Sequence, residues 1–187
     1  MLKPASAAAS AVIADLARAL EPRLPELAER LADIICATDQ VYREQRLVNH
    51  DQLLESCRSN LREHIRALSI LPRVDSAHMD SCRATGRRRA EQGLPLENLL
   101  HAYRLGGRIL WEGLLEECRS RPDPPKDELL EGAVVVWDSS DEYSAEIARA
   151  YRKAEEQILS RDKSQRQTLL RSLLTGMATE RDLMLAS

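Results

Sequence analysis

One stretch of the chain, residues 100–115, gathers side chains that could bind a small molecule. It places a histidine, two aromatic rings and two arginines within about three helical turns, and a second tryptophan lies further along the chain. The candidate pocket set is His101, Tyr103, Arg104, Arg108, Trp111 and Trp137. Arginines bind anions and aromatic walls suit planar molecules, so the set indicates an anionic or planar ligand. The alternative, which we favour, makes Tyr103 a core residue and Trp111 a core or interface residue, with the arginines lying over apolar neighbours.

Other reactive side chains show no catalytic or metal-binding spacing. No Gly-rich loop follows a strand, no Gly-x-Ser-x-Gly motif occurs, and acidic pairs such as Glu116-Glu117 lie on charged helix faces. The four histidines and four cysteines have no zinc-type spacing, and one His on a helix does not indicate haem. We therefore expect no enzyme, no metal and no cofactor. Unpaired cysteines further indicate reduced thiols in the cytoplasm.

The charge pattern argues against nucleic acid and membrane as partners. The net charge is −3, so nothing global attracts phosphate. The run Arg87-Arg88-Arg89 could contact nucleic acid or lipid. It also lies near a predicted helix end, where cations complement the dipole, and we favour that role. The Ala-rich start is interrupted by Asp15 and is too short for a membrane span.

The elements that carry these residues are predicted to be helices. Hydrophobic residues make up 43% of the chain and Phe is absent, so Leu, Ile, Val and Ala fill the core, with the tryptophans and tyrosines as its large pieces. Apolar spacing predicts helices that begin near residues 7, 25, 49, 75, 96 and 126, and a weaker one at 41–47. Asn49 with Gln52 resembles a capping box, and Gly93 before Pro95 marks a helix end. The run 134–136 could be a strand, but no second strand is available to pair with it. We expect an all-α single helical bundle.

The pair Gly106-Gly107 interrupts an otherwise strong helix. Each glycine costs about 0.5–1 kcal/mol relative to alanine inside a helix. We expect the pair to allow close packing of a second helix, with Ser139, Ser140 and Ser144 as facing residues. A kink is the alternative.

The long helical tract after residue 126 is expected to carry a signal out of the domain. Its predicted buried stripe is Leu130, Ala133, Val134, Trp137, Ser144, Ile147, Ala148, Tyr151, Ala154 and Ile158. Residues 161–167 are polar, and apolar spacing returns at Leu169. We expect residues 1–160 to form a helical sensory domain, and 161–187 an output helix with the start of a linker to a downstream domain. Fraying after Ile158 is the alternative.

A family resemblance lies in GRRRAEQGLPLENLLHAYRLGGRILWEGLLEE, Gly86 to Glu117. The Arg-rich helix end, the G-x-P-L-x-x-L-L-x-A-Y-R turn and helix start, and the following G-x-x-x-W resemble PucR-type bacterial regulators. The N-terminal region of those regulators is similar to the RsbR-type stressosome sensor domain. The later RDKSQRQTLLRSLLTG, Arg161 to Gly176, is similar to the helix that leaves that domain. Within the N-terminal third only the helical character matches, so this part belongs either to the bundle or to a dimer arm.

The resemblance implies a globin-like fold without haem, and a homodimer. It also implies downstream domains in the same chain, with a helix-turn-helix that binds DNA. The chain would then be the regulatory, sensory and dimerising input of a cytosolic transcription regulator, open to an unidentified small-molecule effector. The second interpretation is an RsbR-like stressosome scaffold that acts through protein contacts. No catalytic or ligand-binding residues carry over from either family.

Overall fold

The computed structural model describes residues 5–71 and 76–174, and all the regular structure in these ranges is helical. The elements are α1 (Ala7–Leu20), a 3-10 turn η1 (Glu21–Arg23), α2 (Leu24–Thr38), α3 (Gln40–Arg43), α4 (His50–Ser69), α5 (Ser76–Glu91), α6 (Leu96–Ser120) and α7 (Lys126–Leu174). The all-α class is thereby confirmed, and 134–136 is helical. The expected helix over 41–47 is shorter, because α3 stops at Arg43. The predicted cap Asp75 and residues 175–187 of the expected linker lie outside the described residues.

Side-chain caps fix where the first helices begin. The Ser6 hydroxyl accepts a hydrogen bond from the Ala9 amide at 3.1 Å. At the start of α4, the Asn49 side chain accepts from the Gln52 amide at 2.9 Å, and the Gln52 side chain accepts from the Asn49 amide at 3.3 Å. These contacts satisfy amides that lack partners within the first helical turn. The capping box predicted from the sequence is confirmed.

Gly93 ends α5 and turns the chain into α6. Its φ of 70° lies in the left-handed region that favours glycine. The Leu94 amide donates back to the Arg89 carbonyl at 3.0 Å, and the Gly93 amide donates to the Ala90 carbonyl at 3.0 Å. Both bonds satisfy carbonyls at the helix end. The expected stop at Gly93 is confirmed.

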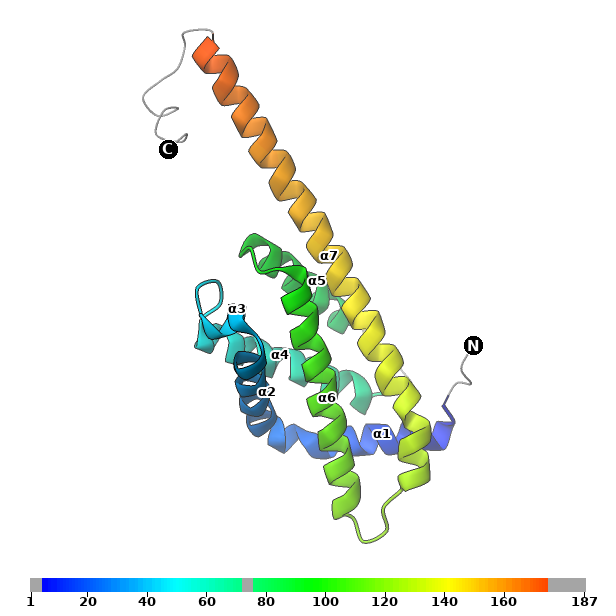
Figure 1. Cartoon of the computed structure of the whole chain (residues 1–187). Helices are drawn as coiled ribbons and strands as arrows, with labels where there is room; N and C mark the ends of the chain where they lie inside the picture. The colour runs from blue at the N-terminus through cyan, green and yellow to red at the C-terminus, as the bar shows by residue number, and fades with distance from the viewer. Residues whose placement is uncertain (1–4, 72–75, 175–187) are drawn as a thin grey trace.

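The helices are arranged around one core, with α7 along one side (Figure 1). Helices α6 and α7 run in opposite directions on either side of the 121–125 loop, and α1 lies across the end of the bundle near that loop. The most extensive contact between helices joins α5 to α7, and α2 packs on α4 and α6. Helices α2 to α6 thus enclose a region that α7 does not fill.

Two glycines mark the tightest crossings of α7. A Cβ atom on Gly86 of α5 would lie 2.5 Å from the Ile147 carbonyl oxygen and 3.1 Å from the Tyr151 amide. A Cβ on Gly132 would lie 2.5 Å from Ile13 Cγ1 of α1. Helix α7 therefore meets α5 at backbone distance, and it meets α1 through one buried isoleucine.

The buried stripe of α7 differs from the predicted one in its first half. Leu129 and Val136 are buried, whereas Leu130 is 66% exposed and Trp137 is 47% exposed. Apolar residues occur in adjacent pairs here, so the pattern does not say which member faces inward. The face is settled by Gly132, which must lie against α1 and which brings Leu129 and Val136 inward with it. Trp137 is therefore not one of the large core pieces.

The second half of α7 leaves the bundle. The helix has 49 residues, and at about 1.5 Å per residue it is about 73 Å long. Ala154 is its last buried residue, and Leu159 and Leu170 are 64% and 59% exposed. The helix continues without a break through the polar segment 161–167 and projects well beyond the other helices (Figure 1). The expected division at residue 160 falls within this continuous helix.

Candidate functional site

The structure does not bring the sequence-predicted pocket residues together. Of the residues on α6, Tyr103 lines a buried cavity, and His101 is partly buried outside that lining. Arg104 lies in an open groove between α6 and α7. Arg108 is exposed, and its guanidinium donates to the Glu112 carboxylate at 2.8 Å. Tyr103 is thus the one member of the set that reaches the cavity.

The two tryptophans form a pair at the surface. The ring centroids of Trp111 on α6 and Trp137 on α7 are 6.2 Å apart, with their planes at 43°. Trp111 is partly buried and Trp137 is half exposed. The pair stabilises the contact between α6 and α7, and neither ring lines the cavity.

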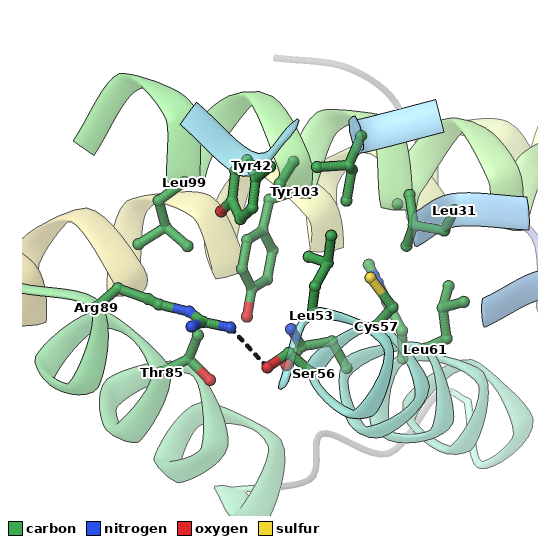
Figure 2. Close-up of a pocket in the computed structure, with 15 residues that line it drawn as sticks. Leu31, Tyr42, Leu53, Ser56, Cys57, Leu61, Thr85, Arg89, Leu99 and Tyr103 are labelled. Atoms are coloured by element: carbon green, nitrogen blue, oxygen red, sulfur yellow. Dashed lines mark hydrogen bonds between the residues drawn. The ribbon is translucent and has the colours of Figure 1, made fainter. Parts of the chain in front are cut away.

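The cavity lies between α2, α3, α4, α5 and α6 and has a volume of about 50 Å³. Figure 2 shows its lining. The lining residues are Leu31, Ile35, Tyr42, Leu53, Ser56, Cys57, Asn60, Leu61, His64, Thr85, Arg89, Leu99, Ala102, Tyr103 and Gly106. Five helices contribute, so the cavity exists only in the folded chain.

The lining has a polar side and an apolar side. In Figure 2 the Tyr103 hydroxyl and the Arg89 guanidinium point toward each other, close to Ser56 and Thr85. Leucines from α2 and α4 lie at the other end. A mixed lining of this kind can orient a molecule that has one polar end and one apolar end.

Arg89 is the charged group of the cavity. It is only 3% exposed, and its guanidinium donates to the Gln92 side chain and to the Ser56 hydroxyl, each at 2.7 Å. Among the described residues no carboxylate lies within ion-pair distance of it. Burial lowers the pKa of Arg89 from its usual value, because a low-dielectric surrounding disfavours the charged form. An arginine nonetheless stays protonated in a protein, so the cavity holds a buried positive charge.

The Ser56 hydroxyl is held in one orientation. It donates to the Gln52 carbonyl at 2.7 Å, which uses its single proton, and it accepts from Arg89. Ser56 therefore fixes the guanidinium and has no donor left for a ligand.

Tyr103 places a second donor beside Arg89. Its hydroxyl oxygen is buried and meets no hydrogen-bond geometry with any residue that the structure describes. Burial raises the pKa of Tyr103, and the nearby Thr85 and Arg89 side chains offset part of that rise. The phenol thus stays protonated near neutral pH and keeps its proton for donation.

The cavity thiol is not activated. Burial raises the pKa of Cys57 to about 12, and Arg89 offsets this only in part. The thiolate is the reactive form of cysteine, so Cys57 is unreactive near neutral pH. It serves as an apolar wall.

The neighbouring glycines of α6 face different surroundings. Gly106 lines the cavity, and a Cβ there would meet only Leu31 Cδ2 at 3.6 Å. A Cβ on Gly107 would lie 3.3 Å from the Ser140 hydroxyl oxygen of α7. Ser140 was one of the serines expected opposite the pair.

Arg89 lines the cavity and was not among the residues predicted from the sequence. We assigned Arg87-Arg88-Arg89 together to the charged helix end, and Arg87 and Arg88 are indeed exposed. Arg89 instead follows Cys82 by seven residues, which places it on the buried face of α5. That spacing was the available signal, because charge alone does not distinguish three consecutive arginines.

The described part of the chain shows neither a metal-binding cluster nor a membrane-spanning helix. In 5–71 and 76–174 no three His, Cys, Asp or Glu side chains form a group that could hold a metal ion. No helix in these ranges is long and apolar enough to span a membrane.

The comparison with protein families gives one match. The model of the RsbT co-antagonist protein rsbRD N-terminal domain matches residues 25–166, which include α2 to α6 and most of α7. No curated protein and no solved structure matches the chain. The matched range covers most of the chain, and the cavity lies wholly within it. The chain therefore belongs to the family of RsbT co-antagonist rsbRD N-terminal domains.

Proposed function

We propose that this chain is a regulatory, sensory and dimerising input domain of a cytosolic bacterial regulator, and that α7 transmits its output. The observation that carries the proposal is the projecting half of α7, which leaves the bundle after Ala154. An isolated helix of polar character is poorly stable in water. A second copy packed along residues 155–172 would cover exposed Leu159 and Leu170 and stabilise this segment.

Two outputs are compatible with this arrangement. The sequence resemblance to PucR-type regulators favours a helix-turn-helix elsewhere in the same protein. The name of the matched family, a co-antagonist of RsbT, favours a protein partner and a stressosome-type scaffold. We propose the transcription regulator first, because the motif in Gly86–Glu117 carries that resemblance. The sequence of the full gene tests the choice. A helix-turn-helix motif would support the transcription regulator. A domain of alternating strands and helices with a phosphorylatable residue, and without a helix-turn-helix, would support the scaffold.

Sedimentation and hydrogen exchange test the dimer. We expect a dimer at micromolar concentration, and amide protection across residues 161–172 that rises with protein concentration. Leu159→Ser with Leu170→Ser should weaken the dimer at least about tenfold. Leu130→Ser, at an equally exposed leucine near the other end of α7, is the matched control. A monomer with fast exchange in 161–172 at every concentration would contradict the proposal.

A further inference from the structure

The Arg89 guanidinium is buried and has no carboxylate near it among the residues that the structure describes. Placing a cation in a low-dielectric interior costs several kcal/mol unless an opposite charge compensates. Arg89 is 3% exposed, and the two side chains that accept hydrogen bonds from it, Gln92 and Ser56, are neutral. Neutral partners compensate the buried charge less well than a carboxylate would. The arrangement is typical of a site that an anion completes.

Arg89 also has donors to spare. A guanidinium carries five N–H groups, and only two of them are engaged by the described residues. The Tyr103 hydroxyl beside it has a proton and makes no hydrogen bond within 5–71 and 76–174, although the Thr85 side chain lies close by. Ser56 holds the guanidinium still, because its own proton is fixed on Gln52. Free donors from α5 and α6 therefore converge on one point of the cavity.

The remaining wall selects what can accompany the negative charge. Most of it is apolar, with Leu31, Leu53, Leu61, Leu99 and Cys57, and α4 adds two polar residues, Asn60 and His64. An apolar group is favoured against such a wall by about 25 cal/mol for each Å² that leaves water. A hydrated inorganic anion gains nothing there. The charge and the wall together indicate a carboxylate with an alkyl tail.

We propose that the cavity binds a short-chain aliphatic carboxylate, whose carboxylate accepts from Arg89 and Tyr103 and whose alkyl tail lies among the leucines of α2 and α4. The volume of about 50 Å³ limits its size. One water-sized group needs about 10–15 Å³ of such volume, so the cavity admits a molecule of roughly three to five heavy atoms, such as acetate or propionate. The inference names a ligand class for the proposed sensory domain, and it does not depend on the dimer.

Nuclear magnetic resonance on the whole chain can test this directly. Sodium propionate is added at constant ionic strength while the Arg side-chain Nε–H resonances are followed. We expect a saturable shift of the Arg89 resonance. Equimolar sodium chloride and the neutral isostere propionamide should leave it in place, and benzoate should be too large to enter.

Matched variants separate the roles of the two donors. Tyr103→Phe removes only a hydroxyl and should weaken propionate binding about tenfold, equivalent to about 1.4 kcal/mol. Arg89→Gln should abolish binding. Arg88→Gln, which changes the exposed neighbour on the same helix, should bind like the parent. If Arg89→Gln fails to fold, the loss of propionate affinity in Tyr103→Phe still tests the proposed site.

The outcomes are distinct. Saturable binding of propionate that Tyr103→Phe weakens supports the proposal. Three results would overturn it: propionate binding that Tyr103→Phe does not change, an equal response to chloride or propionamide, or no response to propionate. The last result would mean that the cavity holds water alone. The oligomeric state is measured separately by sedimentation. If propionate does not bind, the dimer proposal is unaffected. If the chain is a monomer, the ligand proposal is unaffected.

Discussion

The two faces of helix α5 differ in how closely they pack against neighbouring helices. On one face, Gly86 brings α5 within backbone distance of α7, with a Cβ position only 2.5 Å from the Ile147 carbonyl. On the other face, Thr85 and Arg89 line the cavity toward α4 and α6. Residues 85 and 86 are adjacent in sequence, so one turn of helix serves both contacts. The tight contact fixes α5 to α7, and the cavity leaves space on the side of α4 and α6.

The glycines of this fold differ in how closely neighbouring atoms approach them. A Cβ atom on Gly86 or Gly132 would lie closer than 3 Å to a neighbouring atom, so no side chain fits there without a shift. A Cβ atom on Gly106 would lie at an ordinary van der Waals distance from its neighbour. The cost of adding a side chain should therefore depend on whether the atom it meets can move. Four substitutions test that ordering.

The largest effect is expected at Gly86. In Gly86→Ala the new methyl meets the Ile147 carbonyl and the Tyr151 amide, and backbone atoms of a helix cannot move aside alone. We expect a loss of about 3 kcal/mol in the free energy of unfolding, measured by urea denaturation. Ala84→Ser, at an exposed site of α5, should change it by less than about 0.5 kcal/mol. If Gly86→Ala is as stable as the parent, α5 and α7 are not packed at backbone distance at this position.

Gly107→Leu comes next. Its Cβ would lie 3.3 Å from the Ser140 hydroxyl oxygen, and the longer side chain must displace α7. We expect a loss of about 1–3 kcal/mol in thermal or urea unfolding. Gly107→Ala paired with Ser140→Ala is the control, because it relieves the close contact and removes a buried hydroxyl that has no partner among the described residues. An unchanged melting temperature for Gly107→Leu would favour a kink over close packing.

Gly132→Ala should cost less. The atoms that it meets belong to the Ile13 side chain, at 2.5 and 2.9 Å, and a side chain can shift where a backbone cannot. The gain in helix propensity, about 1 kcal/mol, offsets part of the strain, so we expect a net loss of about 1 kcal/mol. Adding Ile13→Ala removes both of these atoms. The double variant should then be more stable than the sum of the two single effects predicts. Strict additivity in this double-mutant cycle would contradict a direct contact.

The smallest effect is expected at Gly106. A methyl there meets only Leu31 Cδ2 at 3.6 Å, so Gly106→Ala should stabilise the protein by about 0.5–1 kcal/mol. It also reduces the cavity and should weaken propionate binding. Differential scanning calorimetry with and without propionate measures both. A destabilised variant would show that the cavity face is as tightly packed as the Gly86 face.

Local signals in the sequence predicted most of the fold, and long-range contacts account for what they missed. The Asn49 box and Gly93 act over three or four residues, so they can be found in the sequence and are confirmed. The buried face of α7 depends on Gly132 meeting α1, which is more than a hundred residues away. Paired apolar residues such as Leu129 and Leu130 leave that choice open.

The site was harder to predict than the fold, for the same reason. The cavity joins Ser56 to Arg89 across 33 residues and two helices. No spacing within one helix encodes such a pair. Tyr103 was a pocket candidate because a histidine, arginines and tryptophans lie near it in the sequence, although we favoured a core role for it. Arg89 was grouped with Arg87 and Arg88, which are on the surface. A buried position in the periodic pattern would have been a better indicator than local charge.

The length of α7 has a mechanical consequence. Residues 155–174 extend the helix by about 30 Å beyond its last buried residue. The Gly86 crossing lies at Ile147–Tyr151, about 37 Å from the end of α7, so a tilt of about 5° there would displace that end by roughly 3 Å. A small repacking beside the cavity would therefore reach the tip of the helix as a displacement comparable to a helix shift at a subunit interface. In the output role proposed for it, α7 would act as a lever whose pivot lies where α5 contacts α7.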